Sequence, residues 1–202
     1  YQSPIEYSGE EVSIDISQSN SASVPTVSYE KQNTTGIYEP FAASIVDAGK
    51  YRITVESNDG CAVGEEIKEL VIEKADIISN GAITFNDFEK VYDGTTNANI
   101  PLNDFSIEDL YVGDDVQVAG YAQASFDTKH AGVNKTVTVS DVTYSGDDAK
   151  NYTLPSTVEN TESTIAPMPV TITVDEGQEK TYDGDASVPS EYTYTATSLP
   201  PG

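Results

Sequence analysis

The sequence predicts an all-β protein built from antiparallel β-sandwich modules arranged end to end. The first observation is that apolar and polar residues alternate over short runs, a period that places one face of a strand in a core. Gly, Asp and Asn turn signals separate these runs, and no segment of ten or more residues has a clear helical period. Thr, Val, Ile and Tyr, which favour strands, are plentiful in the same runs.

A repeated motif divides the chain into modules. Lys90-Val91-Tyr92-Asp93-Gly94 returns as Lys180-Thr181-Tyr182-Asp183-Gly184, and Ile5-Glu6-Tyr7-Ser8-Gly9 is a weaker echo. The three tyrosines lie 85 and 90 residues apart, which is the size of one small domain. We therefore predict a first module over residues 1–75 and a second over 76–166. Residues 167–202 would be a linker and the start of a truncated third module, and we expect that part to pack incompletely.

In the first module we expect three alternating strands followed by a closing strand. Segment 65–73 has the Glu and Lys content of a helix, but its apolar end leads directly into the next module, which favours a strand. The expected strands cover residues 12–17, 25–29, 51–55 and 70–72, with turns at 47–49 and 58–60.

In the second module we expect each strand to be bounded by a turn. Segment 116–126 is interpreted as a strand or hairpin pair around Gly120, and segment 104–115 is expected to be either one short helical turn or loop. The alternation slips at Asp141-Val142, which indicates a bulge or a strand end. The other expected strands cover 82–85, 136–140, 152–154, 161–165 and, after the linker 166–169, 170–174; turns are expected at 92–94, 131–134 and 146–151.

The charge of the chain excludes several partners. It has 34 acidic residues against 10 basic ones, for a formal net charge of −24. Nucleic-acid binding needs clustered Lys and Arg, and the same deficit disfavours anionic membrane surfaces. No apolar run approaches the roughly 20 residues that span a bilayer, so we expect no membrane insertion in this segment.

The repeated motif is interpreted as a structural corner. Tyr92 and Tyr182 would bury their rings at strand ends, Asp93 and Asp183 would brace the turn, and Gly94 and Gly184 would supply the backbone freedom it needs. The alternative is that the tyrosines stack on a ligand. We expect the Tyr92 hydroxyl to bond nearby backbone and to stabilise the second module by about 1 kcal/mol. Tyr51 and Tyr152 are expected to act similarly.

Acidic clusters raise the alternative of a calcium site, because Ca²⁺ prefers several carboxylate oxygens. The candidates are Asp114, Asp115, Asp147 and Asp148, together with a cluster over 104–109. None has the spacing of an EF-hand loop, so solvated acidic loops are the favoured interpretation and no cofactor is predicted.

No enzyme activity is predicted. The single cysteine, Cys61, and the single histidine, His130, fall in different modules, so no thiol–imidazole pair is indicated. Neither a Ser-His-Asp motif nor a paired-carboxylate pocket is indicated. Lys90, Lys135 and Lys180 are candidates for an intramolecular cross-link, but the sequence does not identify their partners.

The motifs of the second module occur in an order that resembles a known family. After the Tyr92-Asp93-Gly94 motif come Asp114, then 131–135 (Ala-Gly-x-Asn-Lys), then 145–152 (Ser-Gly-Asp-Asp-Ala-x-Asn-Tyr). This set resembles the YDG-type repeat domain of large bacterial surface proteins. The first module resembles the related MBG-type repeat, although Ser8 replaces the Asp of the motif and no Lys precedes Tyr7.

The resemblance implies an Ig-like sandwich and an extracellular, bacterial cell-surface setting, with any anchor outside this chain. The expected function is a non-catalytic stalk or spacer in an adhesin-like protein, and the expected partners are neighbouring modules of the same chain. The alternative is a binding module that recognises a glycan or a host protein through its loops, with or without calcium.

Overall fold

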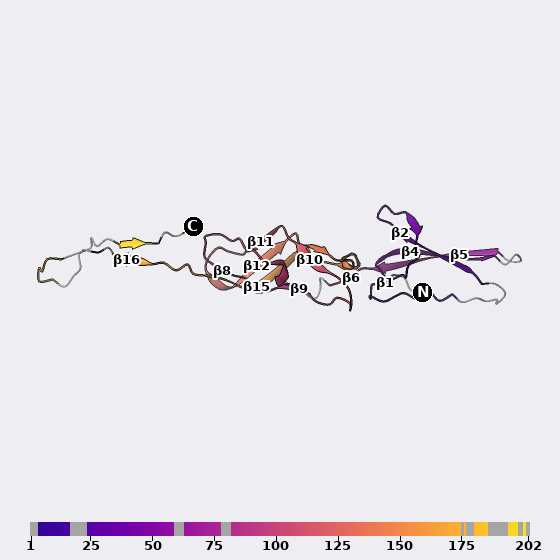
Figure 1. Cartoon of the computed structure of the whole chain (residues 1–202), viewed down its shortest axis with the longest axis horizontal. Coiled ribbons are helices and arrows are strands. Elements are labelled where there is room, and N and C mark those ends of the chain that lie inside the picture. Colours follow the sequence, from indigo (N-terminus) through magenta and orange to yellow (C-terminus); the bar gives the residue numbers. More distant parts are fainter. Residues whose placement is uncertain are drawn as a thin grey trace.

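The computed structural model describes residues 4–16, 24–58, 63–77, 82–174, 176, 180–185, 194–197 and 200. Within these residues the regular structure is β-strand plus two single-turn 3-10 helices, without an α-helix, which confirms the all-β prediction. No helix in the described part of the chain is long and apolar enough to cross a membrane. The strands fall into three groups that follow one another along the longest axis (Figure 1).

The N-terminal segment, residues 4–74, contains one five-stranded sheet in the order β1-β5-β4-β2-β3. Strand β1 runs parallel to β5, and the other neighbours are antiparallel. Its strands are β1 (Ile5–Glu6), β2 (Thr26–Gln32), β3 (Tyr38–Pro40), β4 (Gly49–Asn58) and β5 (Val63–Glu73).

Most strands predicted in this segment are present. Strands β2, β4 and β5 confirm those at 25–29, 51–55 and 70–72, and β5 shows that the helical alternative for 65–73 is wrong. The strand predicted from residue 12 is also wrong over its described residues, 12–16, which form no regular element. Val12 and Ile14 do alternate in burial, and the Val12 N–H bonds the Ile45 carbonyl at 2.8 Å, so this stretch packs over the sheet as irregular chain. Residue 17, Cys61 and most of the turn at 58–60 lie outside the described residues.

The central segment, residues 75–166, holds a four-stranded sheet, β11-β12-β15-β8, and three two-stranded pairs, β7-β9, β10-β13 and β6-β14. Its elements are β6 (Ala75–Asp76), β7 (Ile83–Phe85), β8 (Glu89–Val91), η1 (Leu102–Asp104), β9 (Phe105–Ile107), β10 (Gln117–Gly120), β11 (Gln123–Phe126), β12 (Gly132–Ser140), β13 (Thr143–Ser145), η2 (Ala149–Asn151), β14 (Tyr152–Thr153) and β15 (Thr157–Ala166).

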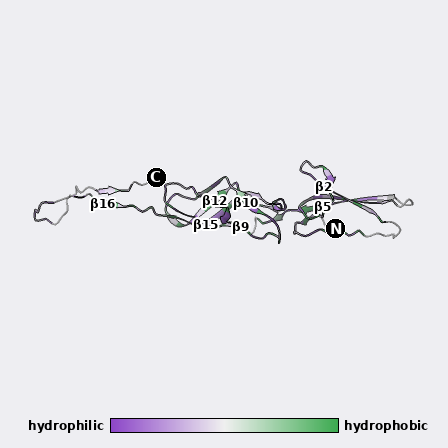
Figure 2. Cartoon of the chain, in the orientation of Figure 1, coloured by the Kyte–Doolittle hydropathy of each residue, from purple (hydrophilic) through white to green (hydrophobic). Residues whose placement is uncertain are grey.

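The core of the central segment lies on the inner face of the four-stranded sheet. Val137, Val139 and Ile165 are fully buried there, and the Phe85 and Phe105 rings from β7 and β9 pack 5.4 Å apart. Hydrophobic residues concentrate on the strands of this segment (Figure 2). The buried apolar residues of the N-terminal and central segments form one continuous cluster.

Three local predictions in the central segment need correction. Strands β10 and β11 both exist but join different sheets, so they are not a hairpin pair. The turn predicted at 131–134 is instead the irregular start of β12, where Asn134 has a φ of 53° and the register to β15 shifts. The helical turn expected within 104–115 is η1, and it begins earlier. The break at Asp141, with a φ of 54°, is confirmed as a strand end.

The C-terminal hairpin pairs β16 (Ile172–Val174) with β17 (Tyr194–Ala196). Every residue of both strands is exposed, including Ile172 at 64% and Val174 at 63%. The hairpin therefore has strand pairing but no buried apolar face within the described residues.

We predict that amide hydrogens of β16 and β17 exchange much faster than those of β12 and β15, because hydrogen bonds in an unburied hairpin open locally. Hydrogen-exchange mass spectrometry on the whole chain measures this. Equal protection of the two regions would contradict the incomplete packing of the C-terminal hairpin.

Candidate functional site

The most extensively bonded site is the joint where the N-terminal and central segments meet. Strand β6, immediately after the N-terminal segment, pairs in parallel with β14, with Ala75 opposite Tyr152 and Asp76 opposite Thr153. The chain thus enters the central segment as part of a sheet, which limits rotation at the joint.

Three tyrosines form an aromatic cluster at this joint. Tyr7 follows β1, Tyr111 lies in the loop after β9, and Tyr152 begins β14. The Tyr7 ring meets the Tyr111 and Tyr152 rings edge-on, with centroids 5.6 Å and 5.5 Å apart. Tyr7 and Tyr152 are each 2% exposed, so the cluster removes two large rings from water.

One carboxylate accepts hydrogen bonds from both buried tyrosines. Asp114 Oδ2 lies 2.8 Å from the Tyr7 hydroxyl and 2.6 Å from the Tyr152 hydroxyl. The Tyr152 hydroxyl also accepts the Tyr111 backbone N–H at 2.9 Å. A buried hydroxyl without a partner is costly, so this shared acceptor fixes both tyrosines across the joint.

The pKa of both tyrosine hydroxyls is raised above the ordinary value of 10.0. Burial is the main cause, and the hydrogen bond to the Asp114 carboxylate adds to it. The folded-state pKa of each hydroxyl is higher than its unfolded-state pKa. The contribution of the two hydroxyls to folding stability is therefore complete below pH 10 and is lost as the pH rises through the folded-state pKa.

A second set of contacts links the loop before β4 to η2. Asn151 is fully buried; its Oδ1 accepts the Ala48 N–H at 3.0 Å and its Nδ2 donates to Asp47 Oδ1 at 3.2 Å. Asp47 Oδ2 also lies 3.0 Å from Lys150 Nζ and 3.2 Å from Lys31 Nζ. The Asp47 loop is therefore attached to the central segment by an amide pair and an ion pair.

The surroundings of Asp47 keep its carboxylate charged. Partial burial alone would raise its pKa, but hydrogen bonds from Lys150, Asn151 and Lys31 outweigh burial and lower it. The contribution of the charged Asp47 to folding stability is present above the ordinary carboxyl pKa and is lost as the pH falls through the lowered pKa.

Gly9 allows the two segments to approach closely. Its φ is 72°, and a Cβ at this position would lie 2.9 Å from the Tyr111 Cβ. Both the backbone conformation and the contact therefore favour glycine.

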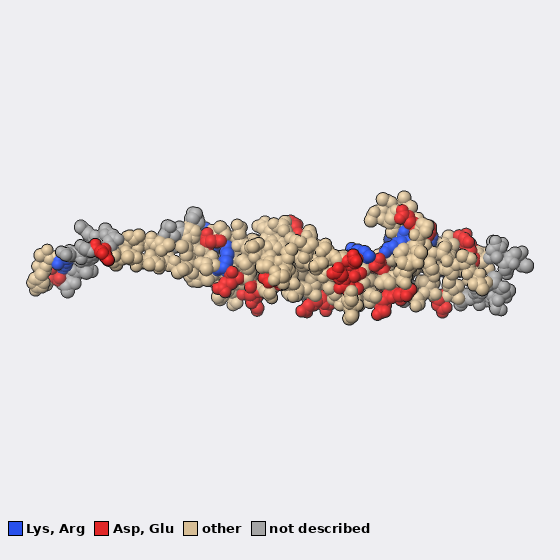
Figure 3. Space-filling view, in the orientation of Figure 1, with Lys and Arg blue, Asp and Glu red and all other residues tan. Residues whose placement is uncertain are grey.

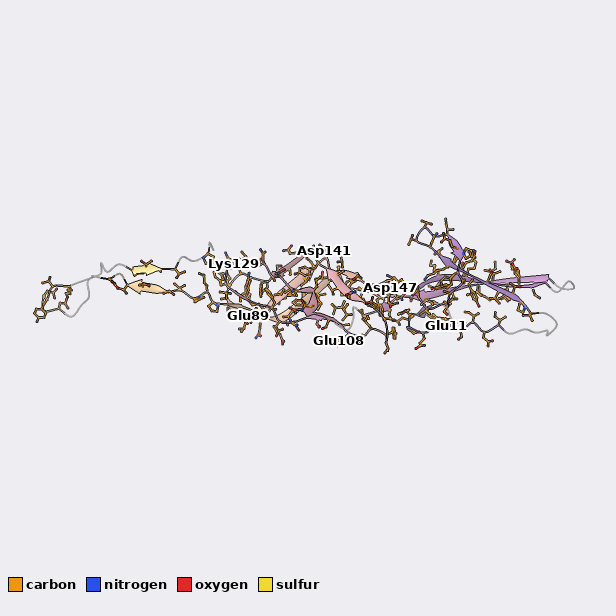
Figure 4. All side chains as sticks on the ribbon, viewed as in Figure 1. Glu11, Glu89, Glu108, Lys129, Asp141 and Asp147 are labelled. Carbon is orange, nitrogen blue, oxygen red and sulfur yellow. The ribbon has the colours of Figure 1, made fainter. Side chains whose placement is uncertain are left out.

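The four candidate calcium ligands lie on two adjacent loops, but they have different hydrogen-bond partners and different exposure. Asp114 bonds the tyrosines, and Asp148 Oδ2 accepts the Asp115 N–H at 2.9 Å. Asp147 is exposed near the joint, where acidic side chains gather (Figures 3 and 4). Gly146, with a φ of 111°, lets these loops pack, because a Cβ there would collide with the Asp115 carbonyl. No group of three or more His, Cys, Asp or Glu able to hold a metal is found among the described residues.

The repeated motif forms a turn closed by its lysine. Lys90 Nζ lies 2.9 Å from Asp93 Oδ1 and also donates to the carbonyls of Thr95 and Asn97. Asp93 Oδ1 accepts the Thr95 N–H and hydroxyl, each at 2.9 Å. The hydrogen bonds from Lys90 and Thr95 lower the Asp93 pKa to about 2.

The second copy of the motif has the same turn in a different setting. Lys180 Nζ lies 3.1 Å from Asp183 Oδ1, which accepts the Asp185 N–H at 2.9 Å. Gly94 and Gly184 both have a φ near 80°. The predicted burial of the Tyr182 ring is wrong, because Tyr182 is 93% exposed, whereas Tyr92 is half-buried. The turn therefore forms with or without burial of its tyrosine.

The hydrogen bond expected at Tyr92 is not formed among the described residues. It is found instead at Tyr51, which is fully buried and donates to the Asp47 carbonyl at 2.8 Å. Tyr152 is also buried and bonded, but its acceptor is a side chain, Asp114. The expected cost of about 1 kcal/mol for losing the Tyr92 hydroxyl therefore does not apply to this chain.

Lysines considered for a cross-link lie beside carboxylates. Lys135 is 7% exposed, and its Nζ lies 2.9 Å from Asp127 Oδ1 and 2.6 Å from Thr128 Oγ1. Lys90 and Lys180 pair with Asp93 and Asp183. Each contact is an ion pair with an exposed carboxylate.

Sequence reasoning missed Tyr7, Asp47 and Asn151 as a functional group. In the sequence, Tyr7 stands out only as an echo of the motif, and Asp47 and Asn151 only as residues of predicted turns. Their partners lie 107 residues away for Tyr7 and 104 for Asp47, so no local spacing indicates the contact. The repeat length was the one available signal, because it predicts where two modules must meet.

Comparison with known families identifies the central segment. A YDG domain is found at residues 78–160. No curated protein and no solved structure matches the chain.

We predict that Lys90→Met lowers the stability of the central segment by about 1 kcal/mol, because it removes the donor that closes the turn. Urea unfolding measures the change. Lys129→Met makes the same charge change at the same end of the segment (Figure 4) and should have little effect. Equal effects of the two variants would contradict the role of Lys90.

We predict that Asp114→Ala destabilises the chain by about 2–4 kcal/mol, because it leaves two buried tyrosine hydroxyls without their acceptor. Asp147→Ala, an exposed carboxylate near the same joint, should change stability by less than about 0.5 kcal/mol. Thermal unfolding of both variants gives the comparison, and a small effect of Asp114→Ala would show that the shared acceptor is not needed.

Proposed function

With a YDG domain at residues 78–160, we propose that this chain is a non-catalytic spacer segment of an exported, adhesin-like protein of the bacterial cell surface. In this proposal the N-terminal segment is an MBG-type module over residues 1–75, the YDG-type module covers 76–166, and both are Ig-like. Residues 167–202 begin a further module.

The joint is the observation that carries the proposal. The buried Tyr7 and Tyr152 both donate hydrogen bonds to the half-buried Asp114 where the two segments meet, and the apolar core runs through this joint. Units connected by a flexible linker would not need such contacts. A stiff connection is what a protein needs in order to hold a distant region away from a surface.

The distribution of tyrosines also favours a spacer over loop-mediated binding. Exposed aromatics gathered on one edge would indicate a glycan or protein site. Tyr7, Tyr51 and Tyr152 are buried instead. Among the described tyrosines, the exposed ones are Tyr111 at the joint and Tyr182 and Tyr194 in the C-terminal part of the chain. Acidic side chains form several patches along the central and N-terminal parts of the visible face (Figure 3), and such negative charge keeps an extended surface protein soluble.

We predict that the chain behaves in solution as one stiff rod across the joint. Small-angle X-ray scattering should give a narrow distribution of lengths for residues 4–166, and Asn151→Ala should broaden it, because the Ala48 N–H and the Asp47 carboxylate lose their amide partner. Asn103→Ala, an exposed asparagine of the same segment, is the matched control. A broad distribution for the unmutated chain would contradict the spacer.

The competing function is tested with the same protein. A glycan array and host-matrix binding assays, each with and without calcium, should give no specific signal for a spacer. Saturable binding that is lost on substitution of exposed loop residues would favour a binding module.

A further inference from the structure

The far end of the central segment has the same strand arrangement as the end of the N-terminal segment that forms the joint. Strand β1 runs parallel to β5 with Ile5 opposite Ile72, and β8 runs parallel to β15 with Lys90 opposite Ile165. The next backbone bonds also match: Tyr7 N–H to the Glu73 carbonyl and Tyr92 N–H to the Ala166 carbonyl, each 2.8 Å. Tyr92 is therefore the structural counterpart of Tyr7.

The loops beside these tyrosines correspond as well. Gly49 of β4 lies opposite Ile72, and Gly132 of β12 lies opposite Ile165. Counting back from the two glycines, Ala131 is the counterpart of Ala48, and His130 is the counterpart of Asp47. The label of Lys129, which precedes His130, marks the far end of the central segment in Figure 4.

The two ends differ in what covers them. Tyr7 is 2% exposed and its hydroxyl bonds Asp114, whereas Tyr92 is half-buried and its hydroxyl has no partner among the described residues. No buried side-chain oxygen in that part of the chain lacks a partner, so the Tyr92 hydroxyl contacts solvent. Ala131 is exposed, and Val133 beside it is 71% exposed.

We infer that Tyr92, His130 and Ala131 form a second docking surface, the distal socket, for the Gly146–Tyr152 loop and the Asp114 carboxylate of another YDG domain. The joint described above is its precedent: the same Asp, Asn and Tyr of the central segment cover Tyr7 and Ala48. The inference rests on the proposed spacer function and names the surface through which successive domains would contact each other.

The distal socket offers fewer polar contacts to a docked domain than the first joint has. Tyr92 supplies the hydroxyl that Tyr7 supplies, and Ala131 supplies the backbone position of Ala48. His130 replaces Asp47, so the ion pair that Asp47 makes with Lys150 has no counterpart. Docking at the distal socket would depend on the tyrosine and amide contacts.

A chain with a duplicated central segment tests the inference. Residues 1–166 are followed directly by residues 74–166, which continues the chain in the register of the first joint. The second copy carries Tyr92→Phe, so that the peptide containing Tyr92 comes from the first copy alone. Tyrosine nitration with tetranitromethane, located by peptide mass spectrometry, is compared with the 202-residue chain. Nitration of Tyr92 in the first copy should slow about tenfold, the factor that corresponds to roughly one net hydrogen bond, while Tyr7 stays protected in both proteins.

Two variants of the duplicated chain sharpen the result. Asp114→Ala in the second copy alone should restore the nitration of Tyr92, because it removes the acceptor for that hydroxyl. His130→Asp in the first copy should slow nitration further, because it recreates the pairing of Asp47 with Lys150. Asp147→Ala in the second copy is the control.

Unchanged nitration of Tyr92 beside a folded second copy would overturn the inference. A second copy that fails to fold would also count against it, because a matching socket would supply contacts equivalent to those of the first joint. Either result leaves the stiffness of the first joint, measured separately with Asn151→Ala, as an independent test of the spacer.

Discussion

The arrangement of the two segments depends on a hydrogen-bonding requirement at Asp114. The Tyr7 and Tyr152 side chains, one from each segment, are buried, and both hydroxyls donate to the same oxygen of the half-buried Asp114. Tyr7 reaches it because β1 pairs with β5, and Tyr152 reaches it because β14 pairs with β6. A rotation at the joint would separate these groups and leave buried polar atoms unsatisfied, so the polar contacts fix an orientation that apolar packing alone would leave adjustable.

The few basic residues serve mainly inside this framework. Within the described part of the chain, seven of the ten Lys and Arg residues form ion pairs: Lys31, Arg52, Lys68, Lys90, Lys135, Lys150 and Lys180. Lys31 and Lys150 meet at Asp47 in the joint, and Lys90 and Lys180 close the two motif turns. With 34 acidic residues in the chain, most carboxylates have no cation to pair with and remain solvated. Several of these cations thus hold loops and turns in place, whereas Arg52 and Lys68 pair with glutamates on the strands of the N-terminal sheet.

Local pattern predicted most strands of the N-terminal and central segments because most of these strands bury one face; it also predicted β16, although every residue of that strand is exposed. It was misleading at Val12 and Ile14, where the alternation is real but the chain packs on a sheet face without a strand partner. It also failed at Gly132 and Asn134, where residues typical of turns form the irregular start of a strand. The joint could not be predicted from local sequence patterns, because Tyr7 and Asp47 contact residues more than a hundred positions away. The prediction for the motif tyrosines failed in two respects: Tyr182 is exposed, and the Tyr92 hydroxyl has no partner among the described residues.

The pairing of the closing strand β15 has a mechanical consequence. This strand leads directly out of the central segment, and it is bonded on both sides, antiparallel to β12 and parallel to β8. Tension on the chain would act along the axis of β15, so the bonds on its two edges would carry the load together in shear instead of opening one after another. Resistance to pulling is set by the unfolding rate under load rather than by equilibrium stability. The resistance of the central segment to pulling would therefore depend on how slowly β15 separates from its two neighbours, and not on the equilibrium stability of the segment.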